Sequence, residues 1–90
     1  HRRGVARVFE SVVVLLGEAG EHERALILGG AAATLRRKLG VPAPITDHEE
    51  LSKSLEFARR ALSAAPAEEA QQRGASMSLS EAVRYAESVL

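Results

Sequence analysis

Two histidines lie among acidic residues, in the stretches EHE at 21–23 and DHEE at 47–50. Such groups could bind a metal ion if they converged from one helix face, as at positions i and i+4, or from several elements. Consecutive residues of a helix point in different directions, and both stretches fall in the first turn of a predicted helix. We therefore expect His22 and His48 to be exposed polar side chains, and we predict no metal ligand.

The glycine pair Gly29-Gly30, followed by AAATL, could begin a phosphate-binding loop. Such a loop requires G-x-x-x-x-G-K-[ST] after a strand, so that backbone amides and a lysine converge on a phosphate. No lysine stands at the required position, and the two glycines lie inside a helical pattern. Since each glycine inside a helix costs about 1 kcal/mol relative to alanine, we expect a neighbouring helix to approach closely at this point.

The remaining groups that could act in catalysis are poorly arranged for it. The acidic pairs at 49–50 and 68–69 are neighbours in sequence, which does not suit a catalytic dyad. The sequence contains no Gly-x-Ser-x-Gly elbow, no His-Glu-x-x-His motif and no cysteine. We therefore expect that the chain is not an enzyme, with no catalytic residue and no cofactor.

Two basic clusters could contact nucleic acid. The 12 basic residues are matched by 12 acidic ones, and no aromatic residue adjoins either cluster to stack on a base. A solvated surface explains both clusters, and at 36–38 the cations also suit the negative end of a helix dipole. Direct DNA binding stays open as the alternative function. Its residues would be Arg36, Arg37, Lys38, Arg59 and Arg60.

Two helices are predicted in the first half of the chain, at residues 3–19 and 21–39. Apolar residues recur there at gaps of three and four, the spacing of one helix face. Gly17 and Gly20 are expected to end the first helix and Gly40 the second. Because few residues separate the helices, they must form an antiparallel hairpin. The residues expected to pack in this hairpin are Val8, Val12, Leu15, Leu28, Gly29, Gly30, Ala32 and Leu35.

The second half, residues 46–90, is expected to form C-terminal helices after an extended linker at 41–45 that contains two prolines. Thr46 and Glu49 fit a capping box, in which each side chain bonds the backbone amide of the other residue. The third helix should follow this box and run to about Ala65.

The last part of the chain is predicted to hold a short helix and a longer one. Pro66 suits a first helical position, and the helix from there to Gly74 has little to bury. Ser78 and Glu81 form a second capping box before the final helix. No segment alternates with period two, so we predict an all-α fold of four to five helices in a single domain, residues 1–90.

Several segments follow one another in a recognisable order. They are ERA at 23–25, LGGAA at 28–32, LRRKLG at 35–40 and SLSEAVRYA at 78–86. In order and spacing they resemble the C-terminal part of large bacterial, often actinobacterial, transcriptional regulators. These proteins combine a STAND-type ATPase module with a tetratricopeptide-like helical array, often with a LuxR-type domain elsewhere.

The resemblance implies a non-catalytic helical repeat module of a transcriptional regulator, acting in protein–protein interaction or signal relay. The ATP and DNA sites of the family lie in other domains, so no such residue is carried over. The implied partners are other domains of the regulator, a separate protein, or a second copy bound through an exposed face of the solenoid.

The sole methionine is Met77, from which we expect a fragment of a longer protein. No apolar run approaches the ~20 residues of a membrane span, and a cytoplasmic location is expected.

Overall fold

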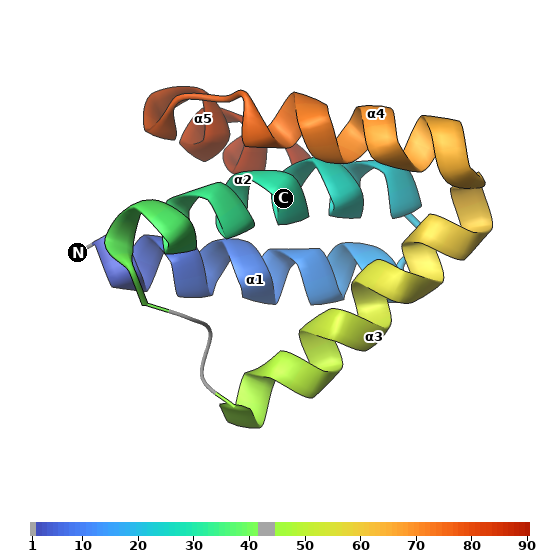
Figure 1. Ribbon diagram of the computed structural model, residues 1–90, viewed down its shortest axis with the longest axis horizontal. Coiled ribbons are helices and arrows are strands. Elements are labelled where there is room, and N and C mark those ends of the chain that lie inside the picture. The colour runs from blue at the N-terminus through green and yellow to red at the C-terminus, as the bar shows by residue number, and fades with distance from the viewer. Residues whose placement is uncertain (1, 42–44) are drawn as a thin grey trace.

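The computed structural model describes residues 2–41 and 45–90, and in those residues it contains five helices and no strand (Figure 1). The prediction of an all-α fold with four to five helices is confirmed. The predicted boundaries of the first two helices are within one residue of the observed ones. The helices are α1 (Arg2–Glu18), α2 (His22–Leu39), α3 (Ile45–Leu62), α4 (Ala64–Ala75) and α5 (Leu79–Val89).

α1 and α2 form the predicted antiparallel hairpin (Figure 1). Gly20 has a φ of 79°, a left-handed conformation in which glycine carries no steric penalty. Its amide donates to the carbonyl of Gly17 at 3.1 Å, and the Glu21 amide donates to the carbonyl of Leu16 at 2.8 Å. These two bonds form a Schellman motif, which satisfies the last carbonyls of α1 and turns the chain back.

The C-terminus of α2 uses the same motif. Gly40 has a φ of 68°, and its amide donates to the carbonyl of Arg37 at 3.2 Å. The Val41 amide donates to the carbonyl of Arg36 at 3.3 Å. The prediction that Gly40 ends this helix is therefore confirmed. The extended linker predicted at 41–45 and the capping box predicted at 46–49 depend on residues 42–44 and on the side chains of residues 45–47, which lie outside the described part of the structure.

α3 ends at Leu62, three residues earlier than predicted, because the chain changes direction at Ser63. Ser63 has a φ of 72° and a ψ of 171°, a combination that side-chain-bearing residues rarely adopt. α4 then begins at Ala64, so that Pro66 is its third residue rather than its first. Proline is tolerated there because the first four amides of a helix have no intrahelical acceptor.

α5 begins with the capping box predicted at Ser78 and Glu81. The Glu81 amide donates to the hydroxyl of Ser78 at 3.2 Å, and the Ser78 amide donates to the Glu81 carboxylate at 2.8 Å. Ala82 and Ala86 are the buried residues of this helix.

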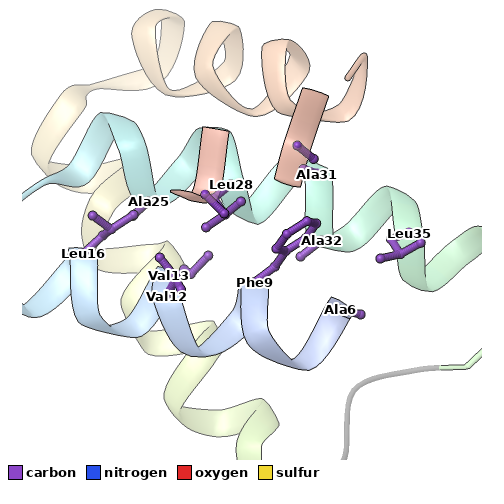
Figure 2. Packing of buried hydrophobic residues seen from close by; sticks show 12 residues of the cluster. Ala6, Phe9, Val12, Val13, Leu16, Ala25, Leu28, Ala31, Ala32 and Leu35 are labelled. Atoms are coloured by element: carbon purple, nitrogen blue, oxygen red, sulfur yellow. The ribbon is translucent and has the colours of Figure 1, made fainter. Parts of the chain in front are cut away.

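α2 is the central helix of the structure. Every residue from 25 to 32 is buried, whereas the other helices alternate between buried and exposed positions. In Figure 1, α2 lies between α1 and α4. On one side it joins a cluster with α1 and α5, in which Phe9 points toward Ala32, and Val13 toward Leu28 (Figure 2).

Another cluster lies on the opposite side of α2, where Leu26 and Ile27 pack with Ala58 of α3 and with α4. Because side chains point outward from all sides of a helix, a central helix needs apolar or small residues around its whole circumference. The stretch from Ala25 to Ala32 provides them.

Candidate interaction surface

The glycines of α2 are packing positions, and this accounts for the feature that could have been a phosphate loop. A Cβ atom on Gly30 would collide with the carbonyl oxygen of Gln71 and would lie 3.1 Å from the amide nitrogen of Ala75, both in α4. A Cβ atom on Gly74 of α4 would collide in turn with the carbonyl oxygen of Ile27. The two backbones are therefore in direct contact, and the predicted close approach is confirmed, without space for a ligand.

The helix that approaches Gly30 differs from the one expected. The hairpin partner of α2 is α1, but Gly30 faces α4, and a Cβ atom on Gly29 would lie 2.6 Å from Leu55 Cδ2 of α3. The prediction that the fourth helix has little to bury is wrong, since Ala67, Ala70 and Gly74 are all buried. Small residues bury little area each, but they allow close backbone contact over the length of the helix pair.

Four of the residues expected in the hairpin are buried together, namely Val12, Leu28, Ala32 and Leu35. Val8 and Leu15 are not, because 56% and 58% of their surfaces are exposed. α1 carries apolar residues around more than half of its circumference, and α2 with its neighbours covers only part of that arc. The placement of Val8 and Leu15 in the hairpin contact is therefore wrong.

Arg36, the first residue of the cation run at 36–38, forms a buried ion pair that the charge pattern did not predict. Arg36 Nη2 lies 2.7 Å from Glu10 Oε1, and Arg36 Nε lies 3.0 Å from Glu10 Oε2, a bidentate contact between α2 and α1. The two side chains are only 10% and 9% exposed. The sequence did contain a signal for this ion pair, because Glu10 lies on the face of α1 that is buried. A buried carboxylate requires a partner.

The five residues of the candidate nucleic-acid site do not come together. The C-terminal turn of α2 and the C-terminal turn of α3 lie at opposite ends of the long axis of the molecule (Figure 1). Arg37 donates to the hydroxyl of Thr34 at 3.0 Å. At the opposite end of the molecule from Arg37, Arg59 and Arg60 line an open depression together with residues of α4. The structure thus offers two small basic areas rather than one continuous basic surface.

The two histidines differ in their surroundings. His48 is exposed, as expected. His22 is half-buried and packs against Phe57, with ring centroids 5.3 Å apart and an angle of 46° between the planes. Within residues 2–41 and 45–90, no group of three His, Asp or Glu side chains is close enough to hold a metal ion.

α3 diverges from α1 toward its own N-terminus (Figure 1). An open groove lies between side chains of the two helices. The groove has a volume of about 380 Å³, and Glu50 and Leu51 form its α3 wall. The residues that α1 contributes are Arg7, Glu10, Ser11, Val14, Leu15 and Glu18.

An exposed face of α1 continues from the groove. It carries Val8, Ser11 and Leu15 along its centre, with Arg7 and Glu18 on the side of the groove. We refer to these five residues as the α1 surface. Exposed apolar residues flanked by charges are typical of a protein contact.

Comparison with known proteins gave no family model, no curated protein and no solved structure that matches this chain. In the described residues, none of the helices combines the length and the apolar content that crossing a membrane requires.

Proposed function

We propose that this chain is a non-catalytic, tetratricopeptide-like helical module of a bacterial transcriptional regulator, which acts in the cytoplasm through protein–protein contact. Two things support the proposal: the order of sequence segments that resembles such regulators, and the α1 surface. The module would relay a signal by binding a protein partner, while nucleotide and DNA sites would belong to other domains.

The single observation that carries the proposal is the exposure of Val8 and Leu15 on a helix in which Phe9, Val12, Val13 and Leu16 are buried. Full burial of a valine or leucine side chain stabilises a structure by about 1.5–3 kcal/mol. Since each residue is roughly half exposed, a partner that covered both would gain about 2 kcal/mol from these two side chains alone. Repeat modules keep such a face for the next element in the array or for a partner.

The test begins with the coding sequence on both sides of these residues and continues with the full-length protein in bacteria. We expect a STAND-type ATPase motif before the chain or a helix-turn-helix motif in the same protein. Leu15→Ser in that protein should lower transcription of a reporter gene, because it weakens the partner contact. Leu90→Ser is the matched control, since Leu90 is 79% exposed and lies outside the α1 surface.

Two outcomes would contradict the proposed function. One is a coding sequence in which neither motif accompanies the chain. The other is unchanged reporter transcription for Leu15→Ser at a protein level equal to that of the control variant.

A further inference from the structure

We propose that the α1 surface pairs with the α1 surface of a second copy of this chain, in antiparallel orientation about a two-fold axis near Ser11. The inference rests on the proposed function in that it assumes a protein contact, and it specifies the partner. The axis relates identical surfaces, so each contact occurs twice.

The first support is a continuous stripe of small and apolar residues on the exposed side of α1. Its members are spaced by four, three, four and four residues, so they lie along one line of the helix. All of them are exposed, and a Cβ atom on Gly4 would meet nothing within 4 Å. The amide of Ala19 still bonds the carbonyl of Leu15 at 3.0 Å, so the helical geometry holds to the end of the stripe. The stripe consists of Gly4, Val8, Ser11, Leu15 and Ala19.

The second support is the symmetry of this stripe under reversal. An antiparallel pair that places Val8 opposite Leu15 of the second copy also places Gly4 opposite Ala19 and brings the two Ser11 residues to the centre. Large residues thus meet large ones on each side of the axis, and the small residues at the ends allow the helix termini to approach. Such packing lets two helices lie 8–10 Å apart.

The third support is charge complementarity. Arg7 and Glu18 are 11 residues apart, which is close to three helical turns, so they lie on the same flank of the stripe. In an antiparallel pair related by a two-fold axis, like flanks face each other. Arg7 therefore lies near Glu18 of the second copy, and the same attraction occurs twice. In a parallel pair this flank would instead face the opposite flank of the stripe at Val5, which carries no charge.

The expected dimer is weak. Standard protein interfaces bury about 20–30 residues on each side, whereas the α1 surface and its stripe offer far fewer. Exposed ion pairs contribute about 0.2–1 kcal/mol each. We therefore expect monomers at about 10 μM and dimers at about 1 mM, the range that corresponds to a dissociation constant of some hundreds of micromolar.

Sedimentation equilibrium over that concentration range tests the charge arrangement. Arg7→Glu and Glu18→Arg, each alone, should weaken the dimer about three- to tenfold, because like charges then face each other. The double variant R7E/E18R should restore the affinity of the original chain. L15S should abolish dimers, whereas the control L90S should leave them unchanged. Helical content measured by circular dichroism verifies that each variant is folded.

Cross-linking tests the axis, because the natural chain contains no cysteine. Under oxidation, S11C should form a disulfide-linked dimer with itself, since the axis passes near this position. G4C and A19C should form few dimers alone but a mixed disulfide when combined, because disulfides require Cα atoms about 4.4–6.8 Å apart.

Several results would overturn the inference. They are a chain that stays monomeric at about 1 mM, a double charge swap that fails to restore affinity, and a dimer that S11C does not cross-link. A monomeric chain would leave the proposed function intact if L15S still lowered transcription in the full-length protein, so the two failures can be told apart.

Discussion

Gly30 of α2 and Gly74 of α4 lie at the crossing of the two helices, and each leaves room for the backbone of the other helix. A Cβ atom on Gly74 would lie 2.6 Å from the carbonyl carbon of Ile27 and 3.0 Å from the amide nitrogen of Ala31. Because these contacts are with backbone atoms, no side-chain rotation can relieve them.

Gly74→Ala and Gly30→Ala should therefore each destabilise the chain by about 2–3 kcal/mol or more through overpacking, measured by chemical denaturation. Gly17→Ala is the matched control. A Cβ atom there would lie 3.4 Å from Ser54 Cβ, an ordinary contact. The higher helix propensity of alanine should make that variant at least as stable as the original chain. Equal stability of all three variants would contradict the close contact between α2 and α4.

The Glu10–Arg36 pair should show strong coupling in denaturation experiments. Removing one partner leaves the other charge buried and costs about 3 kcal/mol, so Glu10→Leu and Arg36→Met should each destabilise the chain. The double variant E10L/R36M should lose much less than the sum of the single variants, since two apolar side chains of similar length can fill the space. Strictly additive losses would show that the two side chains do not interact.

Ser63 should respond to substitution in an unusual way, because its φ of 72° with a ψ of 171° is a region that glycine alone adopts readily. Ser63→Gly should raise the free energy of unfolding by about 1 kcal/mol, as relief of strain exceeds the added flexibility of the unfolded chain. Ser63→Ala keeps the Cβ atom and should give no gain. A thermal melt of both variants compares them directly.

The capping box of α5 should make stability depend on pH in the acid range. The hydrogen bond from the Ser78 backbone amide, followed by the one with its hydroxyl, lowers the pKa of Glu81 below its ordinary value of 4.5. A carboxyl group with a lowered pKa in the folded state stabilises the fold above its unfolded pKa. That contribution is lost as the pH falls through the folded pKa. Denaturation between neutral and acidic pH should show a smaller acid loss for Glu81→Gln than for the original chain.

Nucleic-acid binding by the basic clusters should be undetectable, since the arginines of α2 and α3 lie at opposite ends of the molecule. Fluorescence anisotropy with a labelled DNA duplex at low salt should show no change on addition of the chain, because few phosphates could be neutralised at once. A signal that weakens steeply with added salt, and that is lost in R59A/R60A, would contradict this expectation.

Much of the candidate surface could not be located from the sequence. The apolar pattern of α1 predicted a helix with many residues that could be buried. It did not indicate which of these residues other helices cover. Val12 and Val8 differ by only four positions, yet Val12 is buried and Val8 is exposed. The neighbours of a helix, rather than its own residues, determine how wide a stripe is covered.

The sequence by itself determined the features that depend on residues close in the chain. The helices, the turns at Gly20 and Gly40, and the capping box at Ser78 all follow from hydrogen bonds that span a few positions. Only the tertiary structure decided the contacts between distant segments, such as Arg36 with Glu10, 26 residues apart, or Thr34 with the carbonyl of Ala75, 41 residues apart. The reason is that local hydrogen bonds require compatible neighbours, whereas the choice of a packing partner depends on how the volumes of all the helices fit together.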